Sequence, residues 1–352
     1  MGVPLASVPL AQPVTVTLTR GRIPESVHLV HVAVADAEGR LLASAGDPGL
    51  RAFLRSSAKP LQAIPLIESG AADAFGLDEA ELAVACGSHE GAAVHQQTVL
   101  SLLRKAGLGE EALRCGIHAP GNAATAAELA RSGAAPRRLH NNCSGKHAGM
   151  LATCAHRGWP LEYLGPDHPL QVWIREIVAE ASGESPELAV DGCGVPTFGL
   201  SLHGMAAAYA RMGRGSGLPA ARARAARRLA AAMAARPVLV SGEGSVNTVM
   251  LARHGGRWLT KGGAEGVWCL SVRAEDGAGL GVAVKAVDGS HRGSIPALLA
   301  VLSALGDPGA EDPELARFAR PPVTNTLGQV VGDTRVTLPE RLSQIADAAA
   351  IR

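Results

Sequence analysis

The chain has 352 residues, of which 47% are hydrophobic and 18% are charged, and its formal net charge is +1. This length and composition are those of a globular protein with a substantial core, arranged as one large domain or two. The balanced charge gives no footprint for a nucleic acid or an acidic membrane surface, and the scarcity of aromatic residues leaves no stacking platform for bases. No apolar segment approaches transmembrane length, so we expect no membrane partner. Residues 1–19 lack lysine, arginine and a long apolar run, so no signal peptide is indicated, and we expect a cytoplasmic protein with reduced cysteines.

Strand patterns occupy both ends of the chain. Alternating or continuous apolar residues predict strands at 14–18, 27–34 and 41–45, with a turn at 37–40 between the last two. Further strands are predicted at 257–260, 267–272 and 281–287, with Asp276-Gly277 as the turn before the last of them.

Helical spacing of apolar residues dominates the middle of the chain. Helices are predicted over residues 57–69, 79–85, 92–106, 146–156, 169–181, 200–212, 219–235 and 294–305. Strands at both ends with helices between them predict an α+β fold, in which helices flank a mixed or antiparallel sheet, and not the alternating order of a Rossmann fold. Residues 306–322, which hold four prolines and four acidic residues, predict an exposed connection to a C-terminal strand and tail.

Lysine is rare in this chain, since only five of the 33 basic residues are lysines. Three of the five, Lys59, Lys146 and Lys261, lie in short motifs that also contain serine, cysteine or glycine. Arginine cannot lose its proton in a protein, so it can act neither as a general base nor as a metal ligand. The sequence therefore singles out these three lysines as candidates for chemistry.

Ser56 precedes Lys59 by three residues, a spacing that brings the two side chains onto one face of a helical turn. A lysine that is neutral can activate such a serine, although this motif alone is weak evidence and also fits a surface lysine. Lys261-Gly262-Gly263 follows a predicted strand and is similar to the Lys-x-Gly strand of penicillin-recognising enzymes, whose backbone N–H groups can form an oxyanion hole. Ser88 could pair with Lys261, or it could belong to a polar turn.

Two further motifs contain thiols. Cys143 lies beside Lys146 and His147 at the start of a predicted helix, and Cys193 follows Asp191 in a glycine-containing loop. These residues indicate a zinc site or a reactive thiol, while the alternative is a buried structural cysteine in a capped helix start. Lysine is an unusual zinc ligand because it must be neutral to bind.

Taken together and in this order, the motifs resemble those of the bacterial L-asparaginase II family. The resemblance spans residues 14–334 of a single domain 1–352, with residues 335–352 as a tail. Its most specific marks are Arg55-Ser56-Ser57-Ala58-Lys59-Pro60, residues 140–150 around Asn142-Cys143-Ser144-Gly145-Lys146-His147, Asp191-Gly192-Cys193-Gly194-Val195-Pro196 and Lys261-Gly262-Gly263-Ala264-Glu265-Gly266.

The resemblance implies hydrolysis of L-asparagine by a homodimer whose fold is similar to serine β-lactamases and glutaminases. It further implies the residue roles: Ser56 paired with Lys59, Ser88 paired with Lys261, zinc on Cys143, Lys146 and Cys193, and a substrate pocket lined by Arg55, Asp191 and His147. Gly87 and Glu90 depart from the alanine and serine of many relatives.

We therefore expect Ser56, deprotonated by Lys59, to attack the side-chain amide, while Ser88 and Lys261 relay a proton to the leaving ammonia. Arg55 is expected to bind the carboxylate of the substrate and Asp191 its ammonium group. The alternatives are a glutaminase or another Ser-Lys amidase, and a non-catalytic protein that binds zinc or an amino acid. Lys105 and Lys285 lie in no motif, and we expect their replacement by arginine to be silent.

Overall fold

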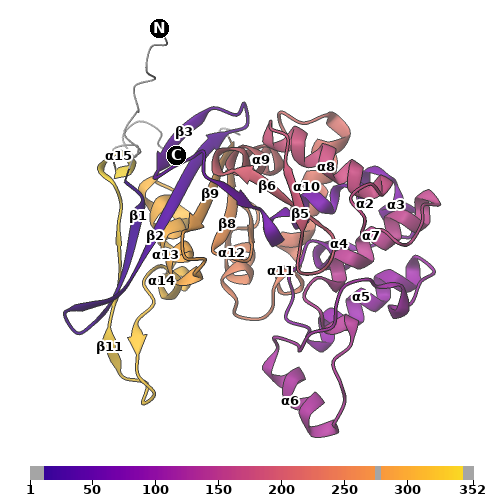
Figure 1. The fold of residues 1–352 in the computed structure, drawn as a ribbon, viewed down its shortest axis with the longest axis horizontal. Coiled ribbons are helices and arrows are strands. Elements are labelled where there is room, and N and C mark those ends of the chain that lie inside the picture. The colour runs from indigo at the N-terminus through magenta and orange to yellow at the C-terminus, as the bar shows by residue number, and fades with distance from the viewer. Residues whose placement is uncertain (1–11, 274–278, 344–352) are drawn as a thin grey trace.

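The computed structural model describes residues 12–273 and 279–343 (Figure 1). Its main sheet has seven antiparallel strands in the order β12-β1-β2-β9-β8-β7, with β3 paired to the edge of β2 opposite β9. These strands are β1 (Val14–Arg20), β2 (Ile23–Asp36), β3 (Leu41–Ala45), β7 (Trp258–Gly262), β8 (Val267–Arg273), β9 (Gly279–Ala286) and β12 (Thr334–Thr337). A three-stranded sheet holds β4 (Arg51–Phe53), β6 (Pro196–Ser201) and β5 (Glu187–Val190), and a two-stranded ribbon holds β10 (Val323–Thr324) and β11 (Val330–Gly332).

Helices pack on both faces of the main sheet and form a large unit beside it (Figure 1). The longer helices are α4 (Glu79–Ala85), α5 (Ala93–Lys105), α6 (Ala123–Ser132), α7 (Ser144–Arg157), α8 (Pro169–Ser182), α9 (Leu202–Arg214), α10 (Ala220–Ala235), α12 (Val246–His254), α13 (His291–Ala304) and α14 (Pro313–Ala319). The shorter ones are η1 (Arg55–Ala58), α1 (Lys59–Gln62), α2 (Ile64–Glu68), α3 (Ala71–Ala74), η2 (Glu110–Ala112), η3 (Arg138–His140), α11 (Pro237–Val240), η4 (Pro308–Glu311) and α15 (Glu340–Ser343). The predicted α+β fold with an antiparallel sheet flanked by helices is confirmed.

Side-chain size separates the two faces of the sheet. On β2, Val30, Val32 and Val34 face the core beneath α13, whereas Ala33 and Ala35 face the core beneath α9. On β9, a Cβ at Gly281 would overlap the backbone of α9. Because alternate residues of a strand point to opposite faces, this pattern lets α9 pack closely against one face while the larger valines fill the other.

Most predicted elements are present, with informative differences. The single helix predicted over residues 57–69 is divided into η1, α1 and α2, which meet near Ala63 and Pro65. Residues 306–322 contain η4 and α14, and the pairing of β12 with β1 continues to Thr337, so three residues of the predicted tail belong to the sheet. The turn predicted at Asp276-Gly277 lies outside the described residues.

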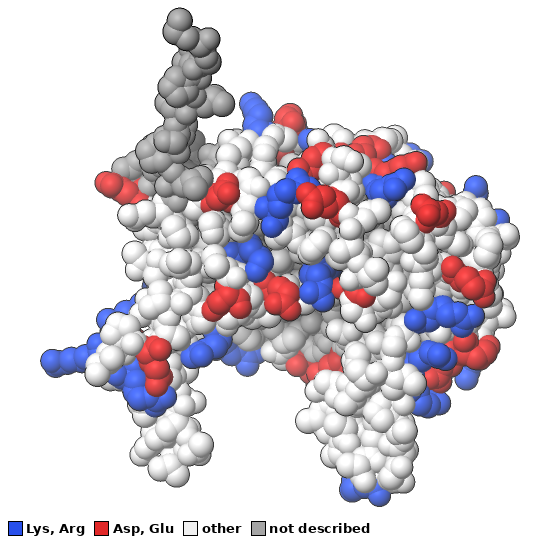
Figure 2. Space-filling model, in the orientation of Figure 1, with Lys and Arg blue, Asp and Glu red and all other residues white. Residues whose placement is uncertain are grey.

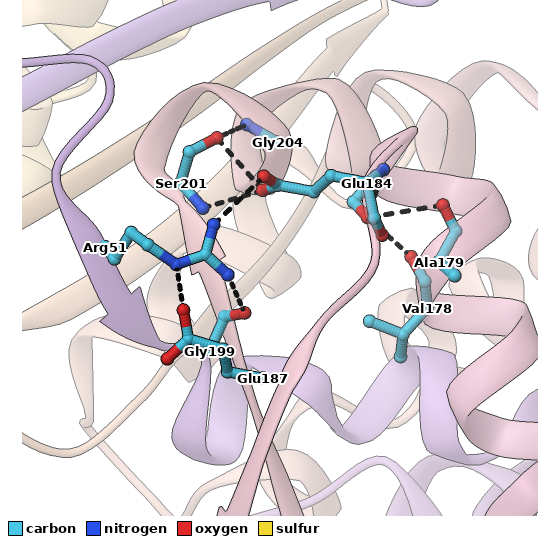
Figure 3. A network of polar contacts seen from close by, with 9 residues as sticks. Arg51, Val178, Ala179, Glu184, Glu187, Gly199, Ser201 and Gly204 are labelled. Carbon is cyan, nitrogen blue, oxygen red and sulfur yellow. Dashed lines mark hydrogen bonds and ion pairs between the residues drawn. The ribbon is translucent and has the colours of Figure 1, made fainter.

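A polar network fixes the three-stranded sheet to the helices (Figure 3). Arg51 of β4 donates to the Gly199 carbonyl at 3.0 Å and pairs with Glu187 at 2.6 Å. Glu184, at the end of α8, accepts from the backbone N–H of Ser201 at 2.6 Å and from its hydroxyl at 3.0 Å. The network anchors β5, and the loop that follows β5 carries Asp191 and Cys193.

No helix among the described residues is long and apolar enough to cross a membrane. Figure 2 shows basic and acidic side chains interspersed over one face of the molecule, as expected from the balanced charge.

Candidate active site

The strand β7 lies directly against the turn that carries Ser56. Ser57, which is fully buried, donates its hydroxyl hydrogen to the Lys261 carbonyl at 2.8 Å, and Tyr209 donates to the Ser57 carbonyl at 2.7 Å. A Cβ at Gly263 would lie only 2.6 Å from the Leu54 carbonyl. Glycine is therefore required for this close approach, which brings the Ser56 turn and the Lys261 strand together.

The backbone of this strand is already hydrogen bonded. The N–H of Gly262 donates to the Asn247 side chain at 3.3 Å, and the N–H of Gly263 donates to the Val267 carbonyl at 2.9 Å. Both N–H groups are thus already hydrogen bonded within the protein. They do not form the oxyanion hole that was expected from the sequence.

The loop that carries Ser88 is held between three helices. It follows α4, whose start has a capping box between Asp78 and Glu81. The Ser88 N–H donates to the Val240 carbonyl of α11 at 2.8 Å. A Cβ at Gly145 would overlap the Val84 carbonyl, so the first turn of α7 rests on the end of α4. This packing places the Cys143-Lys146 motif beside the Ser88 loop.

Lys59 is the central residue of the site. Its side chain is fully buried, and Nζ contacts the Gly87 carbonyl at 2.5 Å, the Ser88 hydroxyl at 2.8 Å and the Asn142 carbonyl at 3.1 Å. Burial lowers the pKa of Lys59, which favours the neutral amine. A neutral amine has two hydrogens and one lone pair. The two carbonyls can only accept, and the pKa of the Cys143 thiol, which also interacts with Lys59, is lowered well below its ordinary value, so that thiol favours the deprotonated form. The hydrogen of the Ser88 hydroxyl can therefore point at this lone pair.

Lys261 is also buried, with 2% of its surface exposed. Its Nζ donates to the Gly262 carbonyl at 2.7 Å. Burial, with help from the charge of Lys59, lowers the pKa of Lys261 to about 7. Lys261 is therefore able to exchange a proton near neutral pH.

The hydrogen bonds differ from the predicted pairs. Lys59 contacts Ser88 instead of Ser56, and no hydrogen bond joins Ser88 to Lys261 in the described part of the chain. The half-buried Ser56 has no hydrogen-bonded side-chain partner there either. The four residues lie on packed neighbouring segments, but the lysine that can activate a hydroxyl is bonded to the serine that is distant in sequence.

The predicted zinc ligands converge in a buried thiol pocket, which here means the set Cys143, Lys146 and Cys193, near Lys59. Lys146 Nζ lies 2.9 Å from Cys193 Sγ, and the Cys143 and Cys193 thiols interact with each other. The hydrogen bond from Cys193 lowers the pKa of Cys143 well below its ordinary value, and the same bond and burial raise the pKa of Cys193. Burial disfavours a charged Lys146, but the charges of Cys143 and Cys193 outweigh it and raise the pKa of Lys146.

This pocket fits a zinc ion by its chemistry, because two thiols and an amine are soft or borderline ligands that face one another. Zinc would require the amine to be neutral and both thiols deprotonated. Among the described residues, no group of three or more His, Cys, Asp and Glu side chains is placed to hold a metal, and only two residues of the predicted set are of those types.

Arg55 and Asp191, the predicted substrate ligands, are paired with each other. Arg55 Nε donates to Asp191 at 2.8 Å, and the backbone N–H of Gly192 donates to the same carboxylate at 2.9 Å. Burial opposes ionisation of Asp191, but Lys146 and Arg55 outweigh it and lower the pKa of Asp191. Arg55 and Glu265 both have positive φ, at 50° and 60°, so backbone strain is concentrated on both sides of the site.

His147 is fully buried and points toward Tyr163. The Tyr163 hydroxyl accepts from the Arg114 N–H at 3.1 Å and lies 2.7 Å from His147 Nδ1, so it donates to this nitrogen and the ring hydrogen is on Nε2. Nε2 is buried without a hydrogen-bond partner in the described residues, and burial lowers the pKa of His147 well below its ordinary value. His147 is therefore a neutral ring with one free donor.

Two participants of the site were not found from the sequence. The Asn142 carbonyl contacts Lys59, but a backbone carbonyl leaves no signal in a sequence. Asn247 accepts from Gly262, and its buried Nδ2 has no partner within the described residues. The sequence feature that could have identified Asn247 is a polar residue next to an apolar one at the start of a helix, in Ser245-Val246-Asn247.

Comparisons with known proteins place the chain in a family. A family model described as L-asparaginase II matches residues 16–336. A search of curated protein sequences finds no significant match.

Among solved structures, a crystal structure of Mglu aligns with a TM-score of 0.41 and 16% identity, over 75% of this chain and 64% of that one. A Bacillus glutaminase aligns with a TM-score of 0.33 and 12% identity, over 73% of this chain and 83% of that one. The chain thus spans less than two thirds of the length of Mglu, and these likenesses carry no conclusion about activity.

Proposed function

Because the chain belongs to the L-asparaginase II family, we propose that it hydrolyses L-asparagine to L-aspartate and ammonia through a Ser-Lys mechanism. Membership of this family supports an amidohydrolase activity. The observation that carries the proposed mechanism is the 2.8 Å contact between Lys59 Nζ and the Ser88 hydroxyl, in which the lone pair of the neutral amine can accept the serine proton.

The proposed reaction starts at Ser88. Lys59 takes the hydroxyl proton, and Oγ attacks the side-chain amide carbon to form a C–O bond. The C–N bond then breaks, and ammonia leaves with the proton returned by Lys59 or by Lys261. Water, deprotonated by the same lysines, hydrolyses the acyl-enzyme and releases aspartate. This assignment exchanges the roles that the sequence motifs gave to Ser56 and Ser88, and Ser56 becomes a candidate for carrying the second proton with Lys261.

Arg55 would bind the substrate carboxylate through its other N–H groups, while its Nε stays paired with Asp191. Cys143, Lys146 and Cys193 would hold zinc, which when bound supplies a Lewis acid able to polarise a carbonyl. The free N–H of His147 is available to an acceptor at the pocket wall.

The decisive experiment measures ammonia release from asparagine and from glutamine. In parallel it measures ring opening of a β-lactam, which releases no ammonia. We expect turnover of asparagine above that of the other two. Faster turnover of glutamine would establish a glutaminase, and no hydrolysis together with binding of zinc or an amino acid would establish a binding protein.

A homodimer is part of the same proposal. Two hairpins project from the edge of the sheet (Figure 1), and they expose large apolar side chains, including Ile23 (72%), Leu327 (79%) and Val330 (68%). A second copy of the chain would cover them. Light scattering on the full chain and on Ile23→Glu tests this, since we expect the wild type to have twice the monomer mass and the variant to dissociate.

A further inference from the structure

Glu90 lies two residues after Ser88 in the same loop, and both residues are half-buried. Burial alternates along the loop, with Gly87, His89 and Gly91 buried and with Ser88 and Glu90 half-buried. His89 points into the protein, where Nδ1 accepts from the Gly91 N–H at 3.2 Å and Nε2 donates to Ser144 at 3.0 Å. Ser88 and Glu90, on either side of the buried His89, are thus the residues of this segment that keep exposed surface.

The position of Glu90 is fixed by its neighbours. Asn122 donates its side-chain N–H to Oε1 at 2.9 Å and its backbone N–H to the Glu90 carbonyl at 2.8 Å. On the other side lies Gly242, where a Cβ would be only 2.5 Å from the Glu90 carboxyl carbon. The bare backbone of Gly242 thus leaves room for this carboxylate, which is held in one place as a ligand group must be.

Glu90 takes part in none of the ion pairs between described residues. Its hydrogen-bonded side-chain partner there is the neutral amide of Asn122, and its charge acts on the imidazole of His95, whose pKa burial nevertheless lowers. Asp191 differs, because it already has Arg55, the Gly192 N–H and the nearby charge of Lys146. A carboxylate outside any ion pair can accept hydrogen bonds from the cationic group of a ligand.

We propose that Glu90 is a specificity-determining residue that binds the α-ammonium group of the amino-acid substrate. The inference rests on the proposed function, in which a zwitterionic amino acid is bound beside Ser88. Oε1 holds Asn122, and Oε2 accepts from the ammonium group. This role was expected of Asp191, whose charge is instead needed to balance Arg55 and Lys146.

The test compares L-aspartate with succinate, which differ only by the ammonium group, in calorimetric titrations of wild type, Glu90→Gln and Glu128→Gln. Glu128 is an exposed residue of α6 paired with Arg131, so the second variant is a matched control. We expect the wild type and the control to prefer aspartate, and Glu90→Gln to weaken aspartate about 10- to 100-fold while succinate is unchanged or tighter. Retained preference in Glu90→Gln, or no preference in the wild type, would overturn the inference.

Kinetics separates this inference from the proposed function. In Glu90→Gln the KM for asparagine should rise by about the same 10- to 100-fold, and the KM for N-acetyl-asparagine, which lacks the ammonium group, should not. Equal changes for both substrates would contradict a role at the ammonium group. If the wild type hydrolyses neither amide and yet prefers aspartate through Glu90, the proposed activity fails and the binding role stands.

Discussion

Lys59 and Lys146 are both buried, with 0% and 3% of their surfaces exposed, and yet their pKa values shift in opposite directions. Lys59 contacts two carbonyls and a hydroxyl, and burial outweighs the opposing effect of the Cys143 and Cys193 thiols, so its pKa falls. Lys146 lies between two thiols and near Asp191, so negative charge prevails over burial and its pKa rises. Burial alone therefore does not make a lysine a base, because the charge of its neighbours decides.

The largest expected effect follows from removing the hydroxyl that Lys59 contacts. Ser88→Ala should lower kcat by at least about 10³-fold, because the nucleophile is lost. Rapid-quench mass spectrometry of the wild type with asparagine should find the acyl group on the peptide that contains Ser88. Acylation of Ser56 would instead support the Ser56–Lys59 pair predicted from the sequence motif. The control is Ser57→Ala, which removes a buried hydroxyl that bonds the Lys261 carbonyl.

The next effect tests the neutral lysine. Lys59→Arg should lower kcat by about 10²- to 10⁴-fold, because arginine keeps its proton and cannot act as a base. The matched control is Lys105→Arg, at a partly exposed lysine that pairs with Glu81 at 2.7 Å and can be replaced by another cation. Thermal unfolding of both variants separates lost chemistry from lost folding. Full activity of Lys59→Arg would remove Lys59 from the mechanism.

A smaller effect is expected from pH. With a pKa of about 7, Lys261 becomes neutral as pH rises through neutrality, so kcat/KM should increase across this range and Lys261→Arg should lack the increase. The pKa of the lysine is 10.5 when unperturbed, so the unfolded chain binds more protons than the folded one between about pH 7 and 10.5. The contribution of Lys261 to stability therefore rises with pH over this window. A flat rate profile would exclude Lys261 from proton transfer.

The smallest of these effects concerns the thiol pocket. Zinc binding must displace the proton of Lys146 and that of Cys193, so we expect release of about two protons per zinc near pH 7. Calorimetry in two buffers of different ionisation enthalpy measures this number, and Cys143→Ser should weaken the binding. If zinc binds without releasing protons, or binds Cys143→Ser equally well, the three residues do not form the site.

Much of the fold was predictable from local patterns. The hairpin of β2 and β3, the strands β7, β8 and β9, and the helices α7 to α10 follow from period and turn chemistry that act over a few residues. The sheet formed by β4, β5 and β6 was not predicted, because the three strands are short and have no pattern of their own, and because β4 pairs with the distant β6, as in Arg51 with Ser201. The predicted silence of Lys285→Arg is untested, but Lys285 donates to the Glu265 and Ala286 carbonyls at 2.7 and 2.6 Å, which no motif indicated.

The sequence by itself determined which residues could carry chemistry. The rarity of lysine and its association with serine, cysteine and glycine identified Lys59, Lys146 and Lys261, and the order of the motifs indicated the family. Only the tertiary structure decided which groups meet: that Lys59 contacts Ser88, that Asp191 is balanced by Arg55, and that Glu90 takes part in no ion pair between described residues. The reason is physical. A sequence motif fixes contacts within one turn of a helix. The long side chain of a lysine instead contacts groups that the packing of distant segments brings beside it, and the pKa of the lysine depends on all of those groups.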